Sequence, residues 1–159
     1  MLIFYTYRLK IQNSISHIDN LTPEQRSKTM AAIKSSGTKI EQEFIEALLQ
    51  RKIRSLEFHV DELPGKPDVV HRKAKIAIFL DGCFWHGCPE HYNIPETNRE
   101  YWKTKIKRNK RRDRQNNNEL KKAGWLVLRI WGHSIKKERS RKWWLTRIEN
   151  LVRKRLQKN

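Results

Sequence analysis

The chain has 159 residues, of which 35 are Lys or Arg and 17 are Asp or Glu, so its formal net charge is +18. This length allows one domain with a hydrophobic core, and no apolar run is long enough to span a membrane. Two cysteines are too few for a disulfide framework. The excess of positive charge favours a large polyanion as partner, with nucleic acid as the first candidate.

The first residues, 1–17, fit poorly with the rest of the chain. They lack the basic start and the small-residue cleavage site of a signal peptide. We expect a peripheral or disordered extension here, with an edge strand as the alternative. Residues 18–159 are predicted to form a single domain.

Two helices are predicted next in the chain. Thr22 followed by Pro23 is typical of a helix start, and a short helix is expected through 27–33. Thr38 and Glu41 have the spacing of a capping box, and apolar residues follow them at helical intervals.

Three short strands are predicted after these helices, at 57–60, 68–71 and 75–80. The segment 63–67 between the first two contains two prolines and a glycine, which indicates a turn. The third strand is nearly all apolar and is therefore expected at the centre of the sheet. The block 81–92 contains two glycines and a proline, so we expect a loop.

A long helix is predicted over Asn98–Ala123, with Gly124 at its C-cap. Between Arg99 and Arg114 this helix carries nine basic residues and two acidic ones. A buried strand over Trp125–Trp131 and an amphipathic helix over Arg141–Gln157 are expected to follow. The resulting order, α-β-β-β-α-β-α, predicts an α/β fold.

Two carboxylates are predicted to lie close together at one edge of the sheet. Asp68 begins one strand and Asp81 ends the next, an arrangement in which many nucleases bind magnesium. Pro-Asp is also common at turns, so a capped strand start at Asp68 is the alternative. Nucleases of this kind usually have an acid and a lysine two residues apart on the second strand. This chain has Asp81-Gly82-Cys83 there, so His86 is the nearest candidate for the base.

Four potential zinc ligands lie in and beyond the glycine-rich block: Cys83, Cys88, His91 and His133. A closed tetrahedral site would join this loop to the end of the strand over 125–131 and would be structural. The alternative is that the cysteines are buried hydrophobic residues and that His133 lies on the surface. Clustered cysteines with histidines favour a reduced, cytosolic chain.

Three aromatic residues are predicted to insert between bases. Phe84 and Trp85 are adjacent in a glycine-flanked loop, and Trp102 lies on the following helix. Exposed aromatic residues among cations can stack on bases or wedge between base pairs. The alternative is that one of them packs the loop down. Contacts to the DNA backbone are predicted for four cations of the helix: Arg99, Lys103, Lys107 and Arg111.

The block Asp81–Cys88, taken with Leu63–Asp68 and Arg99–Trp102, closely resembles very-short-patch-repair (Vsr) endonucleases. The resemblance runs from about Leu21 to His133 and includes further matches at Arg26-Ser27-Lys28, Met30, Thr38–Glu41 and Gly124-Trp125. It implies a restriction-endonuclease-like α/β fold, with a mixed central sheet flanked by helices and a zinc-stapled loop. It also implies a magnesium-dependent nick in duplex DNA beside a T:G mismatch left by deamination of 5-methylcytosine.

The resemblance implies a role for each matching residue. Asp68 looks like the magnesium-binding carboxylate, and the backbone carbonyl of Leu80 looks like a second ligand. His86 looks like the base that activates the attacking water, and Glu41 like the acid that orders water at the metal. The aromatic and Cys/His residues named above fall where the family has its intercalating side chains and its structural zinc ligands.

Two positions depart from the family pattern. Asp81 stands where better-known members have a histidine that touches the phosphate, and we predict that Asp81 joins Asp68 at the magnesium. The spacing after His86 differs by about a residue, so that Cys88 and His91 replace a differently spaced histidine and cysteine.

The predicted partner is duplex DNA with a T:G mismatch, with a functional link to a cytosine-5 DNA methyltransferase. We expect a monomer in the cytoplasm, associated with the nucleoid. A restriction-type endonuclease that cuts paired DNA is one alternative. The other is a non-catalytic, zinc-stapled DNA-binding module, which would bind without magnesium-dependent cleavage.

Overall fold

The computed structural model describes residues 22, 25, 38–51 and 53–158. The chain divides into two compact units, 1–33 and 34–159. In the first unit, the Thr22 hydroxyl accepts a hydrogen bond from the Gln25 amide at 3.2 Å, which confirms the predicted helix start. The predicted extension 1–17 and the predicted helix 27–33 lie outside the described residues.

The second unit contains a four-stranded sheet in the order β1-β2-β3-β4. Its strands are β1 (Leu56–Phe58), β2 (Val69–His71), β3 (Ile76–Asp81) and β4 (Leu126–Trp131). The pairs β1–β2 and β2–β3 are antiparallel, whereas β3 and β4 are parallel, which confirms the mixed sheet. Because Asp81 pairs with Trp131, β3 and β4 end at the same edge of the sheet.

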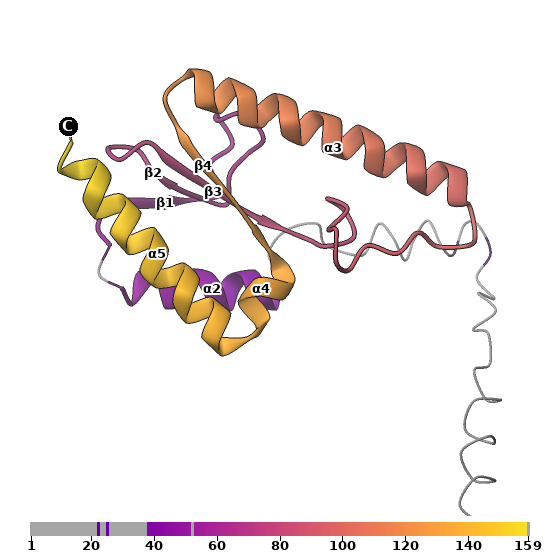
Figure 1. The fold of residues 1–159 in the computed structure, drawn as a ribbon, viewed down its shortest axis with the longest axis horizontal. Coiled ribbons are helices and arrows are strands. Elements are labelled where there is room, and N and C mark those ends of the chain that lie inside the picture. Colours follow the sequence, from indigo (N-terminus) through magenta and orange to yellow (C-terminus); the bar gives the residue numbers. More distant parts are fainter. Residues whose placement is uncertain (1–21, 23–24, 26–37, 52, 159) are drawn as a thin grey trace, which may run out of the picture. The chain divides into compact units, whose positions relative to one another are not determined.

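Helices cover both faces of this sheet, as Figure 1 shows. They are α2 (Lys39–Leu49), α3 (Arg99–Lys122), α4 (Gly132–Lys136) and α5 (Glu138–Leu156). Side chains alternate along β3. Ile76, Ile78 and Leu80 join the core formed with α2, α4 and α5. Ala77 and Phe79 join Leu120 of α3 in a smaller core, so β3 is central, as predicted.

The predicted capping box at the start of α2 is confirmed. The Thr38 hydroxyl accepts a hydrogen bond from the Glu41 amide, and the Glu41 carboxylate accepts one from the Thr38 amide at 3.1 Å. Phe44 and Leu48 are fully buried on the same helix and anchor it against the sheet. Glu41 is therefore held in a fixed position at the N-terminal end of α2.

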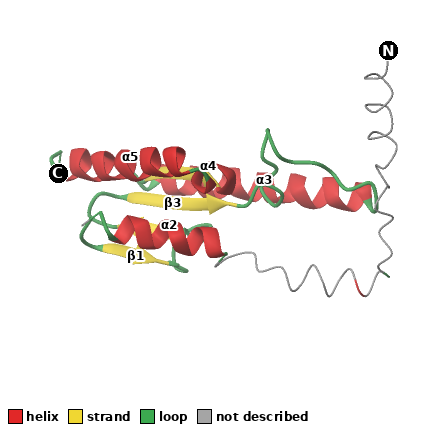
Figure 2. Ribbon diagram, turned by 90° about the horizontal axis from the view of Figure 1, so that it is seen from below, coloured by secondary structure: helices red, strands yellow, loops and turns green. Residues whose placement is uncertain are grey.

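The loop after β3 packs against α3 (Figure 2). The Asn109 side chain donates a hydrogen bond to the carbonyl of Trp85 at 3.0 Å. Gly87 has a φ of +62°, and a Cβ atom there would collide with Lys110 and Ile106 of α3. Glycine is therefore favoured where the loop meets the helix.

Two predictions about the C-terminal part of the chain are wrong. The strand β4 is mostly half-buried, with only Ile130 fully covered, because it lies at the edge of the sheet. The chain forms the five-residue helix α4 directly after β4, and α5 begins at Glu138, three residues before the predicted start. The helix α4 was not predicted because it is only five residues long and begins with a glycine, so the sequence shows no helical pattern there. Within the described residues, no helix combines the length and the apolar character that a membrane crossing needs.

Candidate active site and metal centre

Asp68 lies one residue before β2, and its carboxylate accepts a hydrogen bond from the Leu80 amide at 2.7 Å. Burial raises the pKa of Asp68 to about 6, although the bond from Leu80 opposes this rise. The negative charges of Glu41 and Asp81 raise the pKa further. Carboxylates that disfavour one another's ionisation in this way are relieved by a divalent cation, so the donor set fits magnesium.

A cavity of about 310 Å³ adjoins two of these carboxylates, Glu41 and Asp81. Its lining includes Glu41, Leu80 and Asp81, and also Cys83 and His133. Two residues predicted to hold magnesium, Leu80 and Asp81, therefore border the same cavity as three predicted zinc ligands: Cys83, His91 and His133.

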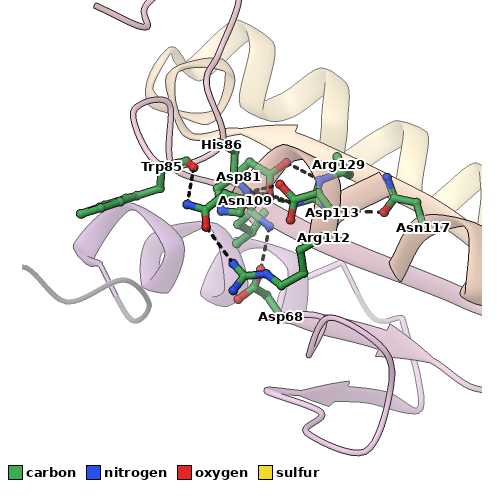
Figure 3. A network of polar contacts seen from close by, with 10 residues as sticks. Asp68, Asp81, Trp85, His86, Asn109, Arg112, Asp113, Asn117 and Arg129 are labelled. Atoms are coloured by element: carbon green, nitrogen blue, oxygen red, sulfur yellow. Dashed lines mark hydrogen bonds and ion pairs between the residues drawn. The ribbon is translucent and has the colours of Figure 1, made fainter. Parts of the chain in front are cut away.

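His86 forms the second part of the site (Figure 3). Its Nδ1 lies 2.7 Å from Oδ2 of Asp113 on α3, and both side chains are mostly shielded from solvent. Burial alone would raise the pKa of Asp113, but the hydrogen bond with His86 and the nearby charges of His86, Arg129 and Arg112 lower it. A neutral imidazole that donates from Nδ1 to Asp113 keeps the lone pair of Nε2 free to accept a proton.

Asp81 faces Arg129 of β4. The guanidinium donates from Nε and from one terminal nitrogen to the two oxygens of Asp81, and each hydrogen bond is 2.6 Å long. The same cation lies 3.2 Å from Nδ1 of His86 and 3.3 Å from Oδ1 of Asp113. Magnesium ligation by Asp81 stays a prediction, because both of its oxygens are paired with Arg129 in this structure.

The four predicted zinc ligands come together at the end of β3 and the start of α4. One ligand atom from each of Cys83, Cys88, His91 and His133 lies within 4.8 Å of the others. Such spacing suits a tetrahedral zinc ion with two sulfur and two nitrogen ligands. Nε2 of His133 also lies 3.6 Å from the Glu90 carboxylate, and a carboxylate often orients a metal-binding histidine in this way.

The aromatic residues form one contiguous cluster. The ring of Phe84 lies 5.1 Å from that of Trp85 and 5.1 Å from that of Trp102. Trp102 is only 6% exposed, whereas the two loop rings are half-buried. In this conformation Trp102 packs among its aromatic neighbours, so its insertion between bases would require this packing to open. Figure 3 shows the Trp85 ring directed away from the His86 network.

The four cations predicted to contact the DNA backbone are all exposed on α3: Arg99, Lys103, Lys107 and Arg111. They are spaced four residues apart and so follow one stripe along the helix. Lys103 also pairs with Glu100 at 2.6 Å. The structure thus presents a basic stripe that suits a polyanion.

Comparison with known proteins decides the family. The family model described as DNA mismatch endonuclease Vsr matches residues 18–91. The DNA mismatch endonuclease Vsr of Escherichia coli K12 is 38% identical, over 67% of this chain and 68% of its own length. This chain belongs to the Vsr family of DNA mismatch endonucleases. It is therefore a DNA endonuclease.

Other Vsr relatives are named as nicking enzymes. The type II nicking enzyme V.NaeI of Lentzea aerocolonigenes is 45% identical, over 68% of this chain and 68% of its own length. The type II nicking enzyme V.NmeDIP of Neisseria meningitidis serogroup C is 43% identical, over 76% of this chain and 82% of its own length.

Sequence reasoning missed two residues of the candidate site, Asp113 and Arg129. Each carried a weak signal. Asp113 is one of only two acids in the basic stretch of α3, and Arg129 is the only charged residue in the strand β4. A charge that breaks such a pattern often has a partner elsewhere in the fold.

Proposed function

We propose that this protein nicks one strand of duplex DNA beside a T:G mismatch produced by deamination of 5-methylcytosine, and that the reaction requires magnesium. The observation that carries the proposal is the partly buried carboxylate of Asp68, which lies in one polar group with the His86–Asp113 pair in a Vsr-family chain (Figure 3). A metal-binding carboxylate and an oriented imidazole are the parts that phosphodiester hydrolysis needs.

Asp68 and the carbonyl of Leu80 would hold the magnesium ion. Asp81 is the third ligand predicted from the sequence, and it would have to release Arg129 to bind the metal. Magnesium, when bound, neutralises negative charge that develops on a phosphate. The raised pKa of Asp68 supports this assignment, because burial and the charges of Glu41 and Asp81 disfavour its ionised form until a cation binds. Glu41 borders the same cavity, and we assign it the ordering of water there.

His86 would act as the general base. Its Nδ1 is engaged by Asp113 at 2.7 Å, which fixes the plane of the ring. Nε2 would then take a proton from the attacking water, and the protonated ring would be stabilised by the Asp113 carboxylate.

Phe84 and Trp85 would enter the base stack, with Trp102 behind them. Unstacking costs least at a mismatch, where pairing is already weak, so insertion would select mismatched DNA without extensive reading of base edges. The exposed stripe Arg99, Lys103, Lys107 and Arg111 would contact phosphates and contribute affinity that falls with salt.

Zinc would be the structural metal, held by Cys83, Cys88, His91 and His133. Four protein ligands leave no open position on the ion, so the site would stabilise the loop and take no part in the chemistry. Burial raises the pKa of the Cys83 thiol, and the adjacent Cys88 adds to this effect. A metal that binds thiolates removes this penalty.

We propose that residues 18–159 form a single domain and that the protein acts as a monomer. Its proposed substrate places it in the cytoplasm, at the nucleoid. Its substrate would arise where a cytosine-5 DNA methyltransferase has modified the genome, because only a methylated cytosine yields thymine on deamination.

A strand-labelled cleavage assay tests the proposal. Duplexes with a T:G mismatch in several methylation contexts are incubated with protein and magnesium, beside fully paired duplexes. Asp68→Ala and His86→Ala are compared with the control Asp61→Ala, which removes an exposed carboxylate that pairs with Lys66.

We expect a nick only at the mismatch, lost in the first two variants and kept in the control. Cutting of paired duplexes would favour a restriction-type endonuclease. Tight binding with no cut in any context would favour the non-catalytic DNA-binding module.

A further inference from the structure

We propose that Arg129 is a positioning residue of the nicking reaction: held by Asp81, it fixes the Asp113 carboxylate and thereby the imidazole of His86. This inference rests on the proposed function of the site. It also gives Asp81 a role other than magnesium ligation, and the experiment below separates the two roles.

Arg129 and Asp81 are diagonal neighbours on adjacent strands. Arg129 pairs with Phe79 in the parallel register, and Asp81 with Trp131. The two hydrogen bonds between them are parallel, so the planar guanidinium meets the planar carboxylate in a fork. The Asp81 side chain is 4% exposed and that of Arg129 is 19% exposed. An ionised carboxylate buried to this extent requires such a partner.

The guanidinium of Arg129 also reaches across to α3. The terminal nitrogen that donates to Asp81 lies 3.3 Å from Oδ1 of Asp113 as well, and the other terminal nitrogen donates to Oδ1 of Asn117 at 3.3 Å. The other oxygen of Asp113 is the one that meets His86. Arg129 therefore ties β3, β4 and α3 together and fixes the rotation of the Asp113 carboxylate.

Two carboxylates compete for Nδ1 of His86. Oδ2 of Asp113 lies at 2.7 Å, and Oδ1 of Asp81 lies at 3.7 Å. Because Arg129 engages both oxygens of Asp81, Asp113 is left as the partner of the ring. The ring orientation determines where Nε2 points, and a displacement of about 1 Å in a reacting group can cost a factor of about 100 in rate.

The other charges at this place do not replace Arg129. A cavity of about 270 Å³ beside His86 is lined by Lys110 and Arg114 of α3, together with Asp81, Asp113 and Arg129. Lys110 and Arg114 are exposed, whereas Arg129 lies between the two carboxylates. Arg129 is therefore the described cation that contacts both acids.

The test compares Arg129→Met with Arg72→Met. Arg72 is a matched control because it also bridges two carboxylates, Glu57 and Glu62, at an exposed position directly after β2. We expect Arg129→Met to lower the single-turnover nicking rate about 100-fold. The Kd for the mismatched duplex, measured with calcium in place of magnesium, and the zinc content should stay unchanged. Arg72→Met should nick like the wild type.

A second substitution tests the competition directly. Adding Asp81→Asn to Arg129→Met removes the freed charge of Asp81, so the double variant should nick about 10-fold faster than Arg129→Met alone. Asp81→Asn by itself should leave the magnesium concentration for half-maximal rate unchanged. If Arg129→Met fails to fold, Arg129→Lys carries the comparison, because lysine keeps the charge and loses the fork.

The outcomes are distinguishable. Absence of mismatch nicking by the wild type would overturn the proposed function itself. Nicking by the wild type and equally by Arg129→Met would overturn the positioning role alone. A raised magnesium requirement in Asp81→Asn would show that Asp81 binds the metal and would overturn its role as the partner of Arg129.

Discussion

At the scale of one residue, the ionised Asp68 carboxylate lowers the stability of the folded, metal-free protein. This carboxylate is partly buried near Glu41 and Asp81, and the pKa rises to about 6 as a result. A group arranged in this way destabilises the empty site and favours the bound cation. Functional sites commonly keep such unfavourable groups.

We predict that Asp68→Asn stabilises the zinc-loaded, magnesium-free protein at neutral pH. The folded pKa of about 6 lies above the ordinary value of 3.8, so the folded state holds the proton more tightly. Stability from this group is therefore full below pH 3.8 and is lost as the pH rises through about 6. Asparagine avoids this loss, which amounts to at most about 3 kcal/mol at pH 7.5.

Urea unfolding at pH 4.5 and pH 7.5 measures this effect. The gain of Asp68→Asn over the wild type should be large at pH 7.5 and small at pH 4.5. Asp61→Asn, at an exposed position, should show no such dependence. An equal effect at both pH values would contradict a penalty for the ionised Asp68.

Asp113→Ala should remove the orientation of His86 without removing the base. We expect the single-turnover nicking rate to fall at least about 100-fold, because a misplaced base is nearly as ineffective as a missing one. The Kd for the mismatched duplex should stay unchanged, since the Asp113 side chain is mostly shielded. Glu119→Ala, which removes an exposed acid from the same helix, is the control. A parallel loss of binding would point to a general distortion of α3.

At the scale of elements, the aromatic residues have two different roles: the helix α3 contributes a packing side chain, and the loop after β3 contributes side chains that are predicted to insert into DNA. Trp102 on α3 is buried, whereas Trp85 is half-buried on the loop. We predict that Trp102→Ala lowers the free energy of unfolding by about 3–5 kcal/mol. Trp85→Ala should cost less stability and should reduce the preference for mismatched over paired DNA. The reverse ranking in urea unfolding would mean that Trp102 is free to insert and that Trp85 is the packing residue.

Element boundaries were predictable where local chemistry sets them. The capping box of Thr38 and Glu41 and the apolar strand β3 follow from patterns within a few residues, and both are confirmed. Edge position and the short α4 depend on the rest of the fold, so the burial of β4 was predicted wrongly.

The site residues also divide into those that local sequence predicts and those that only the fold brings together. The Cys/His group was predictable because three of its four members lie within nine residues of one another, and the structure brings all four together. The pairs His86–Asp113 and Asp81–Arg129 join residues 27 and 48 positions apart. Spacing alone carries no signal for such pairs, since only the packing of α3 and β4 beside β3 makes them neighbours.

For the whole molecule, the Cys/His group is the connection that holds the loop after β3 to the start of α4. We predict one zinc ion per chain by elemental analysis. Removing it with a chelator should lower Tm and abolish nicking, because the loop carries Phe84, Trp85 and His86. Restoring zinc should restore both properties, whereas added magnesium alone should restore neither. Unchanged Tm after complete removal of zinc would contradict a structural role.

The most direct test is the ratio of single-turnover nicking rates on two duplexes that differ in one base, T:G against C:G, with magnesium present. Pairing and stacking at a mismatch are weaker by a few kcal/mol, so we predict that the T:G duplex is nicked at least about 100-fold faster. Equal rates on the two duplexes would contradict mismatch selection and would make this chain a nuclease of paired DNA.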